Sequence, residues 1–169
     1  MQLLLIRHAI AEDRAEFART GQSDYYRPLT DRGRERMARG SAGLRSLVPT
    51  IDLLVTSPLT RAEQTARIVA EAYDGLPIEF ADALATGDGE AFLDWLGECG
   101  RDEVVAAVGH EPHVSDWATW LLTGGRHDFT IVKKGSAMLL EFEGPPRPGT
   151  AWLRWFLAPA QLRGLGAGS

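Results

Sequence analysis

Three short apolar runs stand out along the chain, and polar residues follow each of them directly. The runs cover residues 2–6 (QLLLI), 51–56 (IDLLVT) and 103–108 (EVVAAV). Continuous apolar runs of this length are typical of strands that are buried on both faces of a parallel sheet. A shorter run at residues 78–80 predicts a fourth strand, and the alternation in residues 137–142 and 151–157 predicts a closing hairpin.

Helical signals occupy most of the segments between these strands. Thr30 is expected to cap a helix that ends before Pro49. The apolar stripe of this helix contains Met37, Leu44 and Leu47. Further helices are expected over residues 61–73, near residues 92–99, and between Pro112 and Gly124. Residues 9–28 carry many charges and are predicted to form a long loop.

The alternation of strands and helices predicts an α/β fold. We expect a three-layer α/β/α sandwich around a largely parallel central sheet, formed by a single domain that covers residues 1–158. Residues 159–169 are rich in glycine, and we expect them to form a flexible tail.

Composition narrows the class of protein. The chain has 169 residues, of which 44% are hydrophobic, and a formal net charge of −5 without a long basic run. This composition excludes disordered and fibrous classes, and the charge argues against a nucleic-acid partner.

The single cysteine, Cys99, excludes an intrachain disulfide and suits a reducing compartment. The first apolar run is too short for a signal peptide, and no stretch is long enough to span a membrane, so a cytoplasmic location is expected. The sequence leaves the oligomeric state open, and a monomer is compatible with it.

Basic residues follow all three strong strands. Arg7 and His8 follow the first, the segment from Ser57 to Arg61 follows the second, and His110 follows the third. Because ligands bind at the carboxyl ends of parallel strands, these side chains are expected to converge. Arginines grip phosphate oxygens, and a neutral histidine is a nucleophile. The pattern therefore predicts phosphoryl transfer, in which one histidine attacks and the other, protonated, joins the arginine clamp. Taken singly, each position has a structural alternative as a loop start, an exposed helix start or a tight turn.

Four motifs then give the chain a resemblance to a known family. RHA at residues 7–9, SPLTRAEQTA at 57–66 and VGHEP at 108–112 resemble the histidine phosphatase superfamily, which has the phosphoglycerate mutase-like fold. RPLTDRG at residues 27–33 is similar to its SixA-type branch of phosphohistidine phosphatases. The resemblance runs from residue 2 to about residue 122.

The resemblance implies a role for each matching position. His8 corresponds to the nucleophile that becomes phosphorylated. Arg7 and Arg61 correspond to the arginines that bind phosphate, and His110 to the histidine that completes the pocket. No metal and no cofactor are implied, and no metal-binding motif is present in the sequence.

Two departures from the family pattern affect the expected substrate. Ala9 stands where the family usually has glycine, which is tolerated unless the backbone needs a positive φ. The acidic proton donor of many relatives has no clear equivalent in this chain. The nearby acids are Asp82, Asp88 and Glu90, and each suits a turn or a helix start instead. Without a well-placed proton donor, a phosphorylated imidazole is favoured as the leaving group over an alkoxide, which leaves poorly. The expected substrate is therefore phosphohistidine on a protein, with a small phosphomonoester, or a phosphate-binding module without turnover, as alternatives.

Three further residues are candidates for the rim of the pocket. Arg27 belongs either to the pocket or to a solvated loop. Ser57 is a phosphate donor or a helix cap, and Thr60 is the other candidate for that cap. His113, three residues after His110, is a rim residue that could touch the leaving group.

Overall fold

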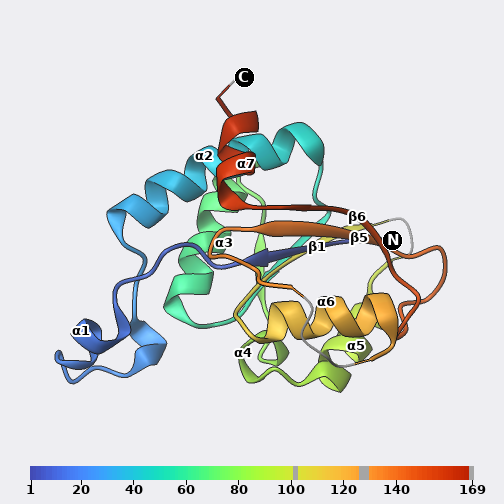
Figure 1. Ribbon diagram of the computed structural model, residues 1–169, viewed down its shortest axis with the longest axis horizontal. Coiled ribbons are helices and arrows are strands. Elements are labelled where there is room, and N and C mark those ends of the chain that lie inside the picture. The colour runs from blue at the N-terminus through green and yellow to red at the C-terminus, as the bar shows by residue number, and fades with distance from the viewer. Residues whose placement is uncertain (101–102, 126–129, 168–169) are drawn as a thin grey trace.

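A six-stranded sheet forms the centre of the molecule (Figure 1). The computed structural model describes residues 1–100, 103–125 and 130–167. The strand order is β3-β2-β4-β1-β5-β6, in which β3, β2, β4 and β1 run parallel and β5 and β6 are antiparallel additions. The strands are β1 (Gln2–Arg7), β2 (Leu53–Thr56), β3 (Ile78–Phe80), β4 (Val104–Gly109), β5 (Ala137–Glu141) and β6 (Trp152–Leu157). The largely parallel sheet, the short strand β3 and the closing hairpin of β5 and β6 are as predicted.

Helices cover both faces of the sheet, which gives the three layers expected from the sequence. On one face lie α2 (Asp31–Leu47), α3 (Thr60–Ala72) and α7 (Pro159–Leu165). On the other face lie α4 (Ala83–Thr86), α5 (Gly89–Glu98) and α6 (His113–Thr123). Alternate residues of β1 supply the two cores: Leu4 and Ile6 face the first set of helices, and Leu3 and Leu5 face the second. The strand is apolar throughout because neither face meets solvent.

Helix α2 begins where the sequence predicts, because the side chain of Thr30 accepts a hydrogen bond from the backbone N–H of Gly33 at 2.9 Å. Met37 and Leu44 are buried in the core as expected. Leu47 is 39% exposed, so its assignment to the apolar stripe is wrong. It lies in the last turn of the helix, whereas the next residue, Val48, is buried in the core.

The segment from residue 9 to 28 is more ordered than the predicted loop. It contains the helix α1 (Arg14–Ala18) and the 3-10 turn η1 (Asp24–Tyr26), which project from the body of the protein (Figure 1). The side chain of Asp13 caps α1 by accepting hydrogen bonds from Ala15 and Glu16. Short capping interactions of this kind order the segment although it has little apolar surface to bury.

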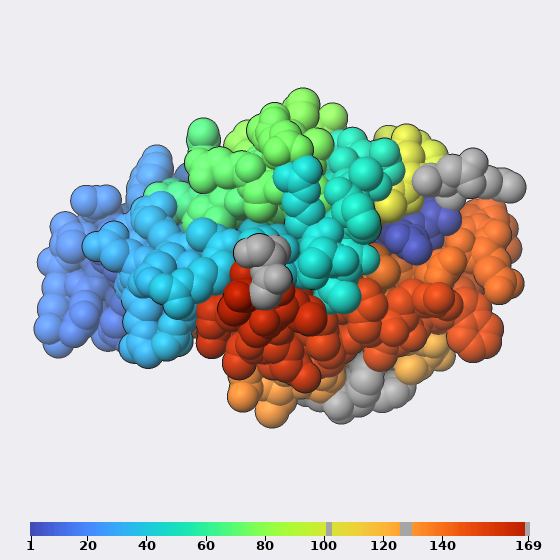
Figure 2. Space-filling model, turned by 90° about the horizontal axis from the view of Figure 1, so that it is seen from above, coloured from blue at the N-terminus to red at the C-terminus, as the bar shows by residue number. Residues whose placement is uncertain are grey.

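The predicted flexible tail is also wrong for residues 159–165, which form α7. Residues 168–169 of that tail lie outside the described part of the chain. Helix α7 lies against α2 (Figure 2), and Leu162 is buried to 1% exposure. A Cβ atom on Gly43 would lie 1.9 Å from the carbonyl oxygen of Leu162, so the two helices are in backbone contact. Only a glycine in α2 permits this approach.

Candidate active site

The carboxyl ends of β1, β2 and β4 bring the predicted residues together. Arg7 pairs with Gly109 in the register of β1 and β4. Past the ends of the strands, the N–H of His8 donates to the carbonyl of Gly109 at 3.0 Å. The N–H of Ser57 donates to the carbonyl of Val108 at 3.1 Å. Three segments separated by about 50 residues in the sequence therefore present their first loop residues at one edge of the sheet.

The side chain of His8 has a defined tautomer. Its Nδ1 lies 2.7 Å from the carbonyl oxygen of Ala9, and because a carbonyl only accepts, Nδ1–H is the donor. The other ring nitrogen, Nε2, then carries the lone pair. His8 is 5% exposed, so its ring is held in a dry environment with that nitrogen available for attack.

His8 and His110 are both neutral at pH 7. Burial, followed by the charge of His110, lowers the pKa of His8 to about 2, although its hydrogen bond to Ala9 acts in the opposite direction. Burial, together with Arg61 and His113, lowers the pKa of His110 to about 3. The sequence analysis expected one of the two histidines to be protonated. The negative charge of a bound phosphate group would favour that form by offsetting the arginines.

His110 is positioned by Ser57. The Nε2 of His110 lies 2.9 Å from the Oγ of Ser57, which is fully buried. The same Oγ accepts the N–H of Leu59 at 3.3 Å, in the turn before α3. The N-cap residue of α3 is Leu59, without a side-chain cap, so neither Ser57 nor Thr60 is the helix cap. The ring centroids of His8 and His110 are 5.0 Å apart.

Four guanidinium groups, those of Arg7, Arg14, Arg27 and Arg61, line the same space. Arg7 donates through Nη1 to the carbonyl of Val132, which fixes it against the loop before β5. Arg61 and Arg27 are almost completely buried, at 5% and 6% exposure. Within the part of the chain that the structure describes, the Nε atoms of Arg7 and Arg61 have no hydrogen-bond partner. Buried donors without partners are expensive unless a ligand accepts from them, and a phosphate oxygen is the acceptor that suits a guanidinium.

Asp24 holds two of these arginines. Its Oδ1 accepts from the Nε of Arg27 at 2.7 Å, and its Oδ2 lies 3.3 Å from the Nη1 of Arg61. Burial raises the pKa of Asp24, but the hydrogen bond from Arg27 and the charges of Arg61, Arg27 and Arg14 lower it overall. Asp24 therefore stays ionised and orients both side chains. No motif in the sequence predicts Asp24 as a site residue, because its contact with Arg61 joins η1 to α3.

We refer to this space as the arginine–histidine pocket. It has a volume of about 430 Å³ and is lined by Arg7, His8, Ala11, Glu12, Asp13, Arg14, Arg27, Arg61, His110, Glu111 and Lys134. Five of these side chains are cations and three are carboxylates. A chain with a net charge of −5 thus concentrates positive charge at this one edge, which favours an anionic ligand.

The family motifs gain a physical explanation in this arrangement. The N–H of Ala9 donates to the Oγ1 of Thr65, which ties the first motif to the second. Ala9 is not in the left-handed region, since Asp74 is the sole residue other than glycine with a positive φ in the described ranges. The alanine is therefore accommodated without backbone strain. Gly33, in the RPLTDRG stretch, lies under the carbonyl of Ile10, where a Cβ atom would lie 2.1 Å from the oxygen.

The acids considered from the sequence lie elsewhere. Asp88 caps α5 by accepting from Ala91, and Asp82 precedes α4. Neither of them, nor Glu90, lines the arginine–histidine pocket. The pocket contains Glu111 instead, whose Oε2 accepts from the Oγ of Ser115 at 2.6 Å. Its Oε1 is buried without a partner, and its charge acts on Arg7.

Glu111 was not predicted, because the acid of related proteins was expected within residues 82–90. Its position directly after His110 was the available signal. His113 does not line the pocket: its ring packs against Gly87, where a Cβ atom would lie 2.2 Å from it, and lies 5.8 Å from the ring of Trp117. Lys134 was also missed, since the sequence contains nothing that places it beside His8.

Two further properties concern metals and membranes. Across residues 1–100, 103–125 and 130–167, no group of three or more His, Cys, Asp and Glu side chains is arranged to hold a metal ion. Among the same residues, no helix has the length and apolar character needed to cross a bilayer.

The fold and the pocket define a phosphatase of the histidine phosphatase class. The model of the histidine phosphatase superfamily (branch 1) matches residues 3–112, and the chain belongs to this family. An uncharacterized protein of Picosynechococcus sp. (strain PCC 7002) is 37% identical over 139 residues, which are 80% of this chain and 82% of the relative. An uncharacterized protein of Mycobacterium tuberculosis (strain H37Rv) is 28% identical over 137 residues, or 79% and 80% of the two chains.

Solved structures show the same fold. The protein histidine phosphatase SixA, complexed with tungstate, superimposes with a TM-score of 0.79 at 24% identity, and the match covers 96% of this chain and 99% of SixA. The α-ribazole phosphatase of Shigella flexneri has a TM-score of 0.71 at 21% identity, over 94% and 97% of the two chains. A mycobacterial glucosyl-3-phosphoglycerate phosphatase gives 0.69 at 16% identity, over 93% and 99%.

Proposed function

We propose that this protein removes phosphate from phosphohistidine on a protein through a phospho-His8 intermediate. The observation that carries the proposal is the orientation of His8. Its Nδ1–H donates to the Ala9 carbonyl, which leaves Nε2 as the nucleophile in a pocket that four arginines line. A neutral imidazole with a fixed tautomer needs no base to activate it.

The proposed reaction has two displacements at phosphorus. In the first, the lone pair of His8 Nε2 forms a P–N bond while the bond from phosphorus to the leaving nitrogen breaks. The departing imidazole keeps the electron pair of the broken bond and takes up a proton from solvent water on that nitrogen. In the second, water attacks phospho-His8, the new P–N bond breaks, and inorganic phosphate leaves. Arg7, Arg61 and Arg27 would offset charge on the equatorial oxygens in both steps.

A protein substrate is supported by the surroundings of the pocket. Asp24, which contacts Arg27 and Arg61, belongs to η1 together with Tyr25 and Tyr26. These two rings are 42% and 59% exposed and contact each other edge to face. Exposed aromatic side chains are enriched at protein interfaces, so the projecting segment offers a contact surface beside the phosphate-binding groups.

Glu111 supports a second candidate function. An alkoxide leaves poorly and needs a proton, whereas an imidazole is a better leaving group. Glu111 brings a carboxyl group with one buried, unpartnered oxygen into the pocket. If Glu111 serves as that acid, the protein would be a small-molecule phosphomonoesterase that uses the same His8 nucleophile.

The test compares two substrates in the presence of EDTA: a phosphohistidine-bearing protein and an aryl phosphate. The variants are wild type, His8→Asn, Glu111→Gln and the double variant Tyr25→Ala/Tyr26→Ala. The proposal expects rapid loss of phosphohistidine that requires His8 and tolerates Glu111→Gln. It also expects the double tyrosine variant to raise KM for the protein substrate alone.

Other outcomes separate the alternatives. Faster turnover of the ester, with its loss in Glu111→Gln, would favour the phosphomonoesterase. Phosphate binding without turnover of either substrate would favour a binding module. Loss of activity in EDTA would contradict the metal-independent chemistry of the proposal.

A further inference from the structure

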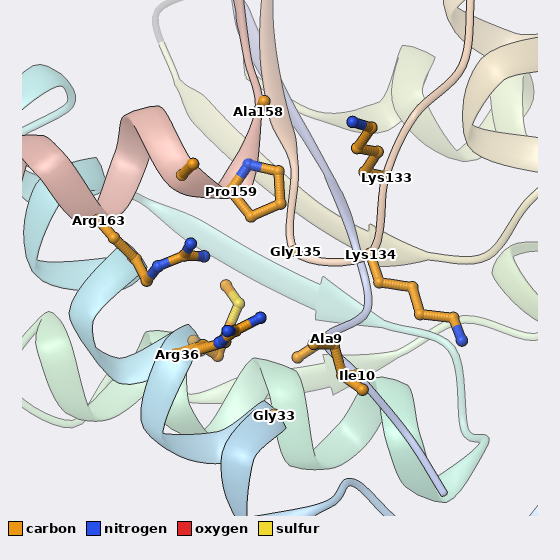
Figure 3. Close-up of a pocket in the computed structure, with 13 residues that line it drawn as sticks. Ala9, Ile10, Gly33, Arg36, Lys133, Lys134, Gly135, Ala158, Pro159 and Arg163 are labelled. Carbon is orange, nitrogen blue, oxygen red and sulfur yellow. The ribbon is translucent and has the colours of Figure 1, made fainter. Parts of the chain in front are cut away.

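A second cavity lies between α2, α7 and the loop before β5 (Figure 3). It has a volume of about 170 Å³. Its lining contains Ala9, Ile10, Gly33, Arg36, Met37, Gly40, Lys133, Lys134, Gly135, Ala158, Pro159, Ala160 and Arg163. We refer to it as the basic cavity. It shares Lys134 with the arginine–histidine pocket.

Positive charge at the basic cavity is not neutralised. Arg36 and Arg163, both half-buried, reach toward each other from α2 and α7 (Figure 3), and Lys133 and Lys134 stand on the loop opposite. No carboxylate belongs to the described lining. Neither Arg36 nor Arg163 forms an ion pair with any residue that the structure describes.

The neighbouring arginines of α2 differ in this respect. Arg39 pairs with Glu35 at 2.5 Å, and Arg45 pairs with Asp74 at 2.6 Å. Arg36 lies one turn before Arg39, and the charges that act on it include those of Arg32 and Arg163. Burial, and then the charges of these two arginines, lower the pKa of Arg36, whereas Glu35 acts in the opposite direction. Because Glu35 is paired with Arg39, the cluster keeps an excess of positive charge, which stabilises a bound anion.

The walls of the basic cavity are apolar. Met37 and Ala9 are buried in the adjoining core, and Pro159 covers the opposite side. A Cβ atom built on Gly135 would lie 3.7 Å from Pro159 and 3.9 Å from the sulfur of Met37, so the glycine faces this space. An apolar cavity of roughly 150 Å³ holds a benzene ring. The combination suits an anionic head group attached to a compact apolar body.

We propose that the basic cavity is a second anion-binding site, which takes a small organic phosphate, phosphonate or carboxylate. Arg36 and Arg163 bind the anionic group of the ligand, and Met37 and Pro159 contact its apolar part. The site is distinct from the arginine–histidine pocket, and the inference does not depend on the proposed function. The loop that closes it is tied to the nucleophile, since the N–H of Gly135 donates to the carbonyl of His8 at 3.1 Å.

The test is calorimetric titration with phenylphosphonate, which phosphatases do not hydrolyse. Wild type is expected to bind two molecules. Arg61→Ala is expected to lose the one in the arginine–histidine pocket and keep the other. Arg36→Ala/Arg163→Ala is expected to show the reverse pattern, with at least a tenfold weakening of the second site and normal aryl phosphate turnover. Arg39→Ala, on the same helix but outside the basic cavity, is the matched control and retains both.

Two further measurements locate and define the site. In the Arg61→Ala protein, phenylphosphonate should shift the backbone amide resonances of Gly33 and Gly135, and methylphosphonate should bind more weakly because it leaves the apolar wall uncovered. If the double variant does not fold, Arg36→Gln and Arg163→Gln singly should each weaken binding. A single binding event in wild type, or an unchanged second site in the double variant, would overturn the proposal.

Discussion

The Nδ1 of His8 lies 2.7 Å from the carbonyl oxygen of the next residue, Ala9. This contact assigns the proton to one side of the ring and the lone pair to the other. The acceptor is the backbone carbonyl of the adjacent residue, so the tautomer of His8 depends on local backbone geometry rather than on a partner side chain. The consequence is a specific requirement for the ring itself.

His8→Asn is expected to reduce hydrolysis by at least about 1,000-fold, because losing a covalent nucleophile removes the whole route through the phosphoenzyme. Wild type that is incubated with labelled substrate and quenched in alkaline detergent should carry an acid-labile, base-stable phosphate that the variant lacks. His113→Asn is the matched control, because the His113 ring lies outside the pocket, and this variant is expected to keep turnover. Full activity in His8→Asn would disprove the covalent mechanism.

Ser57→Ala is expected to lower kcat by about tenfold, because small displacements of a catalytic group have large effects on rate. The variant also leaves Nε2 of buried His110 without its partner, which should cost about 1–2 kcal/mol of unfolding free energy. Ser41 provides the matched control, since it is also fully buried but its Oγ has no partner. Ser41→Ala should therefore be neutral or slightly stabilising in urea denaturation. Equal effects of the two substitutions would show that the bond to His110 has no special role.

Acid should destabilise the protein through its two pocket histidines. Their pKa values are about 2 and about 3 in the folded chain, below the usual value of 6.5, so the unfolded chain binds more protons as the pH falls below 6.5. Each histidine then costs about 1.4 kcal/mol of stability per pH unit below that value, and the loss begins before carboxylates titrate. Urea midpoints measured from pH 7 to 5 should fall less steeply in His8→Asn and in His110→Asn than in wild type. Parallel profiles would contradict the neutral state of these rings.

The contact between α2 and α7 predicts a contrast between two glycines. Gly43→Ala forces a Cβ atom against the carbonyl of Leu162 and should destabilise by about 2–3 kcal/mol, as overpacking does. Gly97 lies in α5 with nothing within 4 Å of its built Cβ atom, so Gly97→Ala should stabilise by about 0.5–1 kcal/mol through helix propensity. Thermal midpoints of the two variants should move in opposite directions. A stable Gly43→Ala protein would mean that α7 does not need this approach.

The sheet and the convergence of the site were predictable because both follow from short-range rules. Strands β1, β2 and β4 are apolar on both faces, and a parallel sheet collects the residues that follow such strands. Arg7, His8 and His110 therefore meet at one edge as expected. Arg27 also lies in the pocket, because its side chain is held there by the ion pair with Asp24.

Other features could not be predicted because they depend on contacts between distant segments. Helix α7 is only seven residues long, and its stability comes from burying Leu162 against α2 rather than from its own propensity. Lys134 reaches the pocket because Arg7 binds the carbonyl of Val132, a contact across 125 positions. Glu111 directly follows His110 in the sequence, but no sequence pattern predicts whether a loop carboxylate points into the pocket or into solvent.

The bond from Arg7 to the Val132 carbonyl also bears on folding. The two residues are 125 positions apart, so the Arg7 side chain is held in place only after the loop before β5 has packed against the end of β1. In the unfolded chain, His8 is an ordinary histidine with its usual proton affinity and no ordered arginines around it. The arginine–histidine pocket therefore forms together with the sheet, and phosphorylation of His8 is not expected in a chain that has yet to fold.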